Sequence, residues 1–472
     1  MEPFDPVEIA KWCGGEWNRV PDPRIKGFCI DSRTVTLGNL FVALKAERDG
    51  HKFINQAVAG GAVGALVDHY EKSSDCPQLL VKDTLCAFQK IAQKHRSLFS
   101  QKVIGVTGSC GKTSTKEILR LLLTDSHCTD GNLNNHLGVP LTLTKINLDK
   151  HKYAVVEAGI NMPGEMDVLA EMINPDVCVI TSIGESHLEG LGTVANVVAE
   201  KIKLWPKSNS ECLGIFPEEL LKYEPFNNAF NESDRRCILV KKESPSVSEY
   251  NPNRVYYDVS TETNECGHSQ DLIINRCGCP PLVSRIPHSS EGIIRNMVLA
   301  CVVAWKLGIT DEEICERLPQ YRPSGLRGSC LVGRGCHYVL DCYNANPSSM
   351  LDSINFFLKK FNSVPRLLLL GGMNELGHSS KAIHRETGKS IRLKCRDHAV
   401  LLGEHAPEFA DGMMESGAAE EQISILKDPD NAKPLIEEFK GAVLLKGSRS
   451  YQLESLIPGW AVEEFEPMKI AC

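Results

Sequence analysis

The stretch from Lys102 to Leu123, KVIGVTGSCGKTSTKEILRLLL, limits what this chain can fold into more than any other part of the sequence. It begins with an apolar β-branched run, passes through a glycine-rich turn and ends in an apolar pattern typical of a helix. A strand, a glycine turn and a helix in this order bind phosphate, because backbone N–H groups and the helix N-terminus together attract an anion. The sequence therefore predicts an α/β sheet with a nucleotide site at this turn.

The residues of this turn suit separate roles toward a nucleotide. The ammonium of Lys112 can reach the β- and γ-phosphates, and the hydroxyl of Thr113 can bind Mg²⁺. One position departs from the usual phosphate loop, since Val106 stands five residues before Gly111, where a glycine is common. An ordinary glycine turn is the alternative interpretation. The residues predicted to bind the nucleotide here are Gly108, Ser109, Cys110, Gly111, Lys112, Thr113 and Ser114.

Composition narrows the class of protein. A chain of 472 residues, 42% apolar and 24% charged, is typical of a soluble globular protein of roughly two to four domains. A net charge of −8 argues against a nucleic-acid-binding surface. The N-terminus does not resemble a signal peptide and no apolar run reaches membrane-spanning length, so we expect a cytoplasmic protein that binds neither nucleic acid nor membrane. The 19 scattered cysteines favour reduced thiols over a disulfide framework.

Pattern changes along the chain predict three units, at residues 1–99, 100–320 and 321–472. In the first unit, strand and helix patterns follow the loop residues Asp31, Ser32 and Arg33. A serine and an arginine in a loop could bind a diphosphate or the edge of a uracil. A solvated turn is the alternative interpretation of this loop.

Polar side chains follow two strands of the second unit. Glu157 stands at the end of the strand predicted for 153–156, and His187 follows the strand predicted for 177–180. Carboxylates at strand ends that face a phosphate loop commonly hold Mg²⁺. The two side chains therefore indicate a metal or phosphate site, although a single histidine is more often structural.

Three other parts of the second unit are less specific. The loop with Asn134 and Asn135 offers amide hydrogen bonds, but asparagine also favours turns. The helix predicted for 194–205 carries Lys201 among other charged residues, and its pattern alone favours a solvated face. The cysteine and histidine spacings over 266–288 do not match those of structural zinc sites.

The third unit alternates strands with helices. The strands predicted for 338–340, 366–370, 399–402 and 442–445 are each followed by glycine or polar residues. This alternation is typical of a doubly wound, Rossmann-like sheet with its site at the carboxyl ends of the strands. The first of these strands ends in Asp341, which is followed by Cys342 and then by the sequence YNANP.

Several motifs, in order and over nearly the whole chain, resemble blocks of the Mur ligase family. DSR followed by LFVALKAERDGHKFINQA resembles its uridine-binding domain, and TGSCGKT resembles its phosphate loop. Further blocks are GNLNNHLGVPLTL, EAGINMPGEM, SIGESHLEG and VVAEK. YNANPSSM, GGMNELG and LLKGSRS are most similar to the MurF type.

The resemblance implies a fold and an activity. The fold is a three-domain α/β architecture: a small N-terminal α/β domain for the UDP substrate, a central P-loop ATPase domain and a C-terminal Rossmann-like ligase domain. The activity is formation of an amide bond, driven by ATP and assisted by Mg²⁺, between UDP-N-acetylmuramoyl-tripeptide and D-alanyl-D-alanine through an acyl phosphate. This reaction would complete the cytoplasmic pentapeptide precursor of peptidoglycan, and the enzyme is expected to be a monomer.

The resemblance also implies roles for residues at matching positions. Lys112, Glu157, His187 and Lys201 are the implied catalytic residues, with Thr113, Glu157 and His187 near Mg²⁺. Lys201 matches a lysine that is carbamylated in several Mur ligases. Asn296 matches an asparagine that contacts adenine, and Arg327 and Asp341 match residues that close over the nucleotide. The implied substrate-binding residues are Asp31, Ser32, Arg33, Asn134, Asn135, Asn344 and Asn346.

Two other functions stay open at this point. The chain could be a Mur-type ligase that adds a different amine, or a P-loop module that binds partners without catalysis. Because the third unit supplies part of the implied site, the ligase interpretation also predicts that catalysis requires the domains to close on one another.

Overall fold

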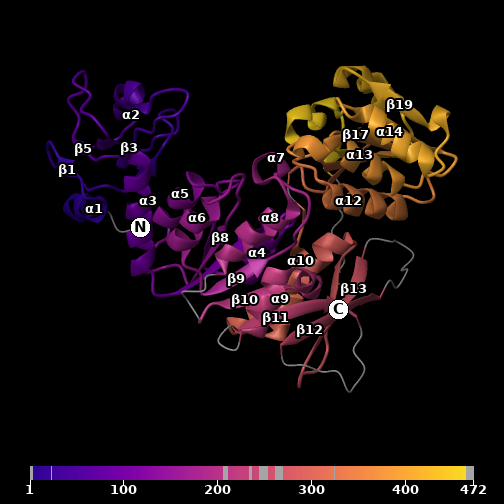
Figure 1. The fold of residues 1–472 in the computed structure, drawn as a ribbon, viewed down its shortest axis with the longest axis horizontal. Coiled ribbons are helices and arrows are strands. Elements are labelled where there is room, and N and C mark those ends of the chain that lie inside the picture. Colours follow the sequence, from indigo (N-terminus) through magenta and orange to yellow (C-terminus); the bar gives the residue numbers. More distant parts are fainter. Residues whose placement is uncertain are drawn as a thin grey trace.

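A computed structural model describes residues 4–22, 24–205, 211–232, 236–243, 253–260, 269–323 and 325–463. The strands of these residues form three sheets that follow one another along the chain, and Figure 1 shows three α/β bodies in a row. This arrangement confirms the predicted fold class. Cys266 and His268 of the cysteine-rich stretch lie outside the described residues. Among the described helices, none has both the length and the apolar character needed to cross a bilayer.

The first body is a five-stranded sheet in the order β1-β5-β4-β3-β2, parallel except for β1 at one edge. Asp5 and Asp83 begin the two longest helices of this body, because each carboxylate accepts a hydrogen bond from a backbone N–H of the first turn. The elements are β1 (Glu16–Trp17), β2 (Gly27–Cys29), β3 (Asn39–Val42), β4 (Gly64–Val67), β5 (Gln78–Leu80), α1 (Pro6–Cys13), α2 (Ile54–Ala59) and α3 (Thr84–Leu98).

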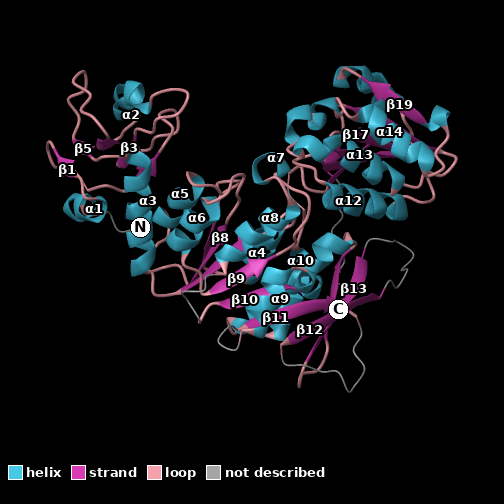
Figure 2. Cartoon of the chain, viewed as in Figure 1, coloured by secondary structure: helices cyan, strands magenta, loops and turns pink. Residues whose placement is uncertain are grey.

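The middle body is a nine-stranded sheet in the order β14-β13-β12-β11-β10-β9-β6-β8-β7. Its strands are β6 (Lys102–Thr107), β7 (Ser126–Cys128), β8 (Tyr153–Glu157), β9 (Val177–Ile180), β10 (Leu213–Pro217), β11 (Cys237–Lys242), β12 (Arg254–Ser260), β13 (Ser269–Arg276) and β14 (Leu282–Pro287). Its helices are α4 (Lys112–Leu122), α5 (Gly138–Thr144), α6 (Glu165–Ile173), α7 (Leu188–Leu191), α8 (Val194–Lys201), α9 (Glu224–Asn231), α10 (Glu291–Lys306) and α11 (Asp311–Arg317). Figure 2 shows helices packed against this sheet.

Strand β6 lies inside the middle sheet and pairs in parallel with both β8 and β9. The register sets Val106 beside Glu157 and Thr107 beside Ile180, so the three carboxyl ends lie at one edge. The side chains of β6 after Lys102 are buried, as expected for a parallel strand covered on both faces. This pairing places the end of β8 next to the turn that follows β6.

The third body is a seven-stranded sheet in the order β19-β18-β17-β20-β16-β15-β21. Its strands are β15 (Ser329–Gly333), β16 (Cys336–Asp341), β17 (Arg366–Gly371), β18 (Asp397–Leu402), β19 (Ile423–Leu426), β20 (Ala442–Lys446) and β21 (Val462–Glu463), and its helices are α12 (Pro347–Lys360), α13 (Ser380–Lys389), α14 (Ala406–Glu415) and α15 (Lys433–Glu438). The strands from β16 to β20 pair in parallel, so their carboxyl ends share one edge.

The third body packs on the middle body through α12, which lies next to α10. Asp352 on α12 accepts hydrogen bonds from the Ser290 hydroxyl (2.6 Å) and from the Gly292 N–H (3.1 Å) at the start of α10. A carboxylate at a helix N-terminus satisfies a free N–H group and faces the positive end of the helix dipole. One body therefore caps a helix of the other.

A buried ion pair joins two neighbouring strands of the third body. Arg366 begins β17 and Asp397 begins β18, and both side chains are 2% exposed. The Arg366 Nε donates to Asp397 Oδ1 at 2.7 Å, and a second guanidinium nitrogen donates to Oδ2. The backbone N–H of Lys394 also donates to this carboxylate, so both charges are compensated.

We expect Asp397→Ala to lower the free energy of unfolding of the third body by about 3–5 kcal/mol, because it leaves the Arg366 charge buried without its partner. Glu415→Ala is the matched control, since Glu415 pairs with Arg385 at the surface and such pairs contribute about 0–1 kcal/mol. Thermal and urea denaturation of the two variants measure the difference. Equal stability of the two variants would contradict the assigned cost of the buried charge.

Candidate functional site

A cavity of about 1460 Å³ lies between the middle and third bodies. Both sheets present the carboxyl ends of their parallel strands to it, which is where α/β sheets bind ligands. The residues predicted from the sequence that line this cavity are Ser109, Cys110, Gly111, Lys112, Thr113, Ser114, Asn134, Asn135, Glu157, His187, Asn296, Arg327, Asp341, Asn344 and Asn346. The structure therefore brings most of the predicted site together from segments far apart in sequence.

The phosphate loop between β6 and α4 is held in one conformation. Gly108 has φ +149° and Gly111 has φ +84°, values that side chains rarely allow. A Cβ at Gly108 would lie 2.0 Å from the Thr181 hydroxyl, and a Cβ at Gly111 would lie 2.6 Å from Asn296 Oδ1. Asn296, expected near adenine, thus packs against the turn itself. Glycine is required at both positions by conformation and by space.

Lys112 is the first residue of α4 and lies over the loop. Its Nζ donates to the backbone carbonyl of Gly108 at 2.8 Å. Burial lowers the pKa of this lysine, while the nearby carboxylate of Glu157 acts in the opposite direction. An ammonium with few protein partners in this position has hydrogen bonds left to donate to an anion in the loop.

Polar groups that include potential oxygen ligands for a cation surround Glu157 at the end of β8. Its carboxylate is 1% exposed. Oε1 accepts from the Thr113 hydroxyl at 3.2 Å and from the Asn134 amide at 2.7 Å. Oε2 is buried and has no hydrogen-bond partner among the described residues. An unpaired buried carboxylate oxygen beside a hydroxyl fits a hard cation such as Mg²⁺, which prefers oxygen ligands.

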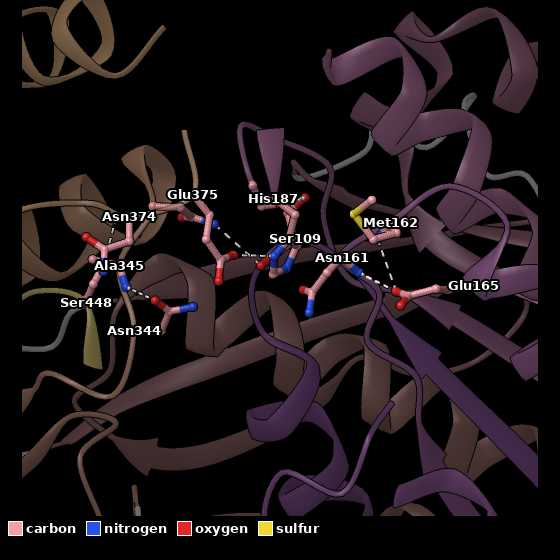
Figure 3. Close-up of polar contacts among 12 residues, drawn as sticks. Ser109, Asn161, Met162, Glu165, His187, Asn344, Ala345, Asn374, Glu375 and Ser448 are labelled. Atoms are coloured by element: carbon pink, nitrogen blue, oxygen red, sulfur yellow. Dashed lines mark hydrogen bonds and ion pairs between the residues drawn. The ribbon is translucent and has the colours of Figure 1, made fainter. Parts of the chain in front are cut away.

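His187 lies between β9 and α7. Strand β6, which leads into the phosphate loop, lies between β9 and the strand β8 that ends at Glu157. Its Nδ1 lies 2.5 Å from Glu375 Oε2, and Glu375 belongs to the third body (Figure 3). Burial lowers the pKa of His187, and the hydrogen bond from His187 lowers the pKa of Glu375. This contact joins a predicted site residue to a carboxylate that the sequence interpretation did not single out.

Lys201 does not lie on a solvated face, so the interpretation from pattern alone is wrong. It is the last residue of α8, is fully buried, and its Nζ has no hydrogen-bond partner among the described residues. Burial lowers its pKa well below the usual value, and the positive charge of Lys112 lowers it further. Glu200 is buried as well and accepts from the Gly164 N–H and from Lys203.

The edge of the third sheet brings Asp341 and Lys446 together. Their side chains lie 3.2 Å apart at the ends of β16 and β20, and Lys446 also donates to the Asn344 carbonyl at 2.7 Å. The guanidinium of Arg327 stacks on the ring of Tyr343, with 3.9 Å between guanidinium carbon and ring centroid. Lys446 was not predicted, although it ends a strand just as Asp341 does.

The two asparagines of YNANP differ in their environment. Asn344 is exposed, and its Oδ1 accepts from the Ala345 N–H. Asn346 is buried and begins α12 with a capping box, in which its Oδ1 accepts from the Ser349 N–H. The Cys110 thiol also donates to this oxygen at 2.9 Å, so Asn346 links the third body to the phosphate loop. Asn346 therefore serves as the cap of α12.

Asp31, Ser32 and Arg33 lie in the first body, outside the residues that line the cavity. The Arg33 guanidinium pairs with the Asp31 carboxylate at 2.6 Å, and this hydrogen bonding lowers the pKa of Asp31 to about 2. The Ser32 hydroxyl donates to Gln56 at the surface. Asn135, by contrast, lines the cavity and accepts from the N–H groups of Leu137 and Gly138.

Comparisons with known proteins identify the same family along most of the chain. The Mur ligase middle domain family matches residues 106–277, and the Mur ligase, glutamate ligase domain family matches residues 329–449. Proteins named UDP-N-acetylmuramoyl-tripeptide–D-alanyl-D-alanine ligase from Haemophilus influenzae and Escherichia coli are each 31% identical to the chain. The matches cover 90% of this chain and 92% of the first protein, and 92% of this chain and 94% of the second.

Solved structures give the same result. The chain is similar to a crystal structure of MurF from Acinetobacter baumannii, with a TM-score of 0.84 and 28% identity over 97% of this chain and 98% of that one. It is also similar to a MurF ligase from Thermotoga maritima in complex with ADP, with a TM-score of 0.74 and 27% identity over 91% and 96% of the two chains. The chain belongs to the MurF family of Mur ligases, the UDP-N-acetylmuramoyl-tripeptide–D-alanyl-D-alanine ligases.

Proposed function

We propose that this chain joins D-alanyl-D-alanine to UDP-N-acetylmuramoyl-tripeptide at the expense of ATP, and so completes the precursor of peptidoglycan used for cell wall synthesis, cell shape and cell division. The observation that carries the proposal is the shared cavity, in which the phosphate loop faces the YNANP loop of the third body. Membership of the MurF family supports the choice of both substrates. The proposed enzyme acts in the cytoplasm as a monomer.

The reaction has two steps. The terminal carboxylate of the tripeptide attacks the γ-phosphorus of ATP, a P–O bond forms, and the bond to ADP breaks. The amine of D-alanyl-D-alanine then attacks the acyl carbon, phosphate leaves, and the amine loses a proton. Because the first step brings two anions together, it needs positive charge between them.

The residues of the middle body meet this need. Lys112 would donate to the β- and γ-phosphates in place of the Gly108 carbonyl it now contacts. Thr113 and Glu157, with His187 at a second position, would hold Mg²⁺, which neutralises charge on the phosphates. Asn134, already bonded to Glu157, orients that carboxylate. The buried site keeps these charges away from water. Electrostatic interactions are stronger in such a site because its effective dielectric constant is lower than that of water.

The three bodies would divide the work. Residues 1–99 would bind the UDP group, with Asp31, Ser32 and Arg33 in contact with it. Residues 100–320 would bind ATP, with Asn296 near the adenine and Asn135 beside the tripeptide. Residues 321–472 would bind the amine. Arg327 and Asp341 close over the nucleotide, and Asn344 and Asn346 shape the D-alanyl-D-alanine pocket. Lys446 supports this pocket by holding the Asn344 carbonyl.

Lys201 would act as a carbamate. Its amine is buried, without a hydrogen-bond partner among the described residues, and burial lowers its pKa well below the usual value, which favours the uncharged form. An uncharged amine can attack CO₂, forming a C–N bond and releasing a proton. The product is an anion, which would lie near the Lys112 ammonium and could support the metal site.

Purified protein is expected to release phosphate from ATP only when both UDP-N-acetylmuramoyl-tripeptide and D-alanyl-D-alanine are present. Lys112→Ala should reduce kcat by about 10²-fold or more, because one electrostatic contact to the transferred phosphoryl group is lost. A phosphate-release assay with a panel of amines measures both effects. A preference for another amine would favour a different ligase, and turnover without any amine would contradict the ligation mechanism.

Asn344→Ala should raise the KM for D-alanyl-D-alanine by roughly tenfold, the effect of one lost hydrogen bond worth about 1–1.5 kcal/mol, while the KM for ATP changes little. Asn346→Ala is the comparison, because loss of a helix cap costs about 0.5–2 kcal/mol of stability. Steady-state kinetics and thermal denaturation of both variants separate the roles. A rise in the KM for ATP alone would remove Asn344 from the amine pocket.

Lys201→Ala should lose most activity and recover part of it with acetate, which can replace the missing carboxylate. Lys203→Ala is the control, because Lys203 is partly exposed and pairs with Asp167 and Glu200 instead. Carbon-13 NMR after incubation with labelled bicarbonate should show a carbamate signal in the unmodified sequence and in Lys203→Ala but not in Lys201→Ala. Full activity of Lys201→Ala without acetate would exclude the carbamate.

A further inference from the structure

We propose that Glu375, a residue of the third body, is the positioning carboxylate for His187, so that closure of the third body completes the metal site of the middle body. The inference rests on the proposed role of His187 near Mg²⁺. It assigns to the GGMNELG segment a task in the reaction that neither sequence nor fold assigns to it. Glu375 acts through His187 and is not itself in contact with the reacting atoms.

The contact between the two bodies at this point is specific. Glu375 Oε2 lies 2.5 Å from His187 Nδ1, and the Glu375 carbonyl accepts from the Glu189 N–H at 3.0 Å. Glu375 therefore meets the segment after β9 with both its side chain and its backbone. Figure 3 shows the Glu375 side chain directed from the third body toward the imidazole. His187 is largely buried, with a side chain 16% exposed.

Both residues have backbone conformations that residues other than glycine seldom adopt. His187 has φ +54° and Glu375 has φ +63°, which for residues other than glycine costs about 1–2 kcal/mol each. Such conformations persist only where surrounding contacts hold them, and they concentrate at functional sites. The contact between the two bodies therefore joins two residues whose backbone conformations are both uncommon.

The loop that carries Glu375 is fixed within the third body. The Met373 N–H donates to His384 Nε2 at 2.9 Å, and the Asn374 N–H donates to the Ser448 hydroxyl at 2.9 Å. The Asn374 amide also donates to the Ser450 hydroxyl. The position of Glu375 consequently follows the third body as a whole, and it cannot follow His187 if the bodies separate.

The chemistry explains why a carboxylate is suited to this position. A histidine that binds a metal through one ring nitrogen usually donates its other N–H to a carboxylate, which sets the tautomer and the ring orientation and strengthens the ligand. Donation from His187 Nδ1 to Glu375 leaves the lone pair on Nε2. Glu375 would thus prepare His187 for the cation only when the third body has closed.

Charge and location support the same assignment. Glu375 and His187 both line the cavity, together with Lys112 and Glu157. A link between the cation and closure would ensure that the acyl phosphate forms only in a site that is shut to water.

Binding of Mn²⁺ as a probe for Mg²⁺, in the presence of a non-hydrolysable ATP analogue, tests the inference without turnover. We expect Glu375→Gln to weaken Mn²⁺ binding by about tenfold or more, the usual effect of losing an outer carboxylate on a metal-ligating histidine. Glu189→Gln is the matched control, because Glu189 contacts Glu375 through its backbone alone and its side chain is exposed. Electron paramagnetic resonance measures free and bound Mn²⁺. Small-angle X-ray scattering under the same conditions should show a larger radius of gyration for Glu375→Gln than for Glu189→Gln.

His187→Ala and Glu157→Gln separate failure of this inference from failure of the proposed function. If both weaken Mn²⁺ binding while Glu375→Gln binds as tightly as the unmodified protein, the metal site stands and the role of Glu375 is overturned. If His187→Ala also binds Mn²⁺ normally, the proposed role of His187 fails and the inference fails with it. A larger radius with unchanged Mn²⁺ affinity would reduce Glu375 to a docking contact and likewise overturn the proposal.

Discussion

The parallel pairing of β6 with β8 and β9 is the constraint on which the site depends. It brings the phosphate loop, Glu157 and the segment that carries His187 to one edge of one sheet. Backbone hydrogen bonds set this register, and a shift by one residue would turn each side chain to the opposite face. The loop itself is then fixed by space, since a Cβ at Gly108 or Gly111 would collide with Thr181 or Asn296. Phosphate binding is thus a property of the middle sheet before any residue of the third body contributes.

The third body contributes contacts to the middle body around the cavity. Three points of attachment lie around the cavity: Asp352 on the start of α10, Asn346 on the Cys110 thiol, and Glu375 on His187. Each of these three is a polar contact, and buried apolar residues of both bodies also belong to one cluster. In the proposed reaction, closure at these contacts would exclude water from the site.

Local patterns were sufficient to predict much of the fold and part of the site. The strand at 177–180 was predicted with its observed ends, and Glu157 and His187 were found because polar residues after buried parallel strands meet at one sheet edge. The strands β14 and β19 were not predicted. β14 alternates buried and exposed residues within a stretch rich in turn residues, and β19 is a short strand at an edge. Lys446 was missed although the same rule about strand ends applies to it.

The sequence by itself determined the fold class, the phosphate loop and the family. These depend on residues close together in the chain, whose spacing is visible without a structure. Only the tertiary structure decided that Lys201 is buried, that Asn346 caps a helix and meets Cys110, and that Glu375 lies against His187. Asn346 and Cys110 meet although they lie 236 residues apart, and no local pattern records which side chains will meet across an interface between two folded bodies.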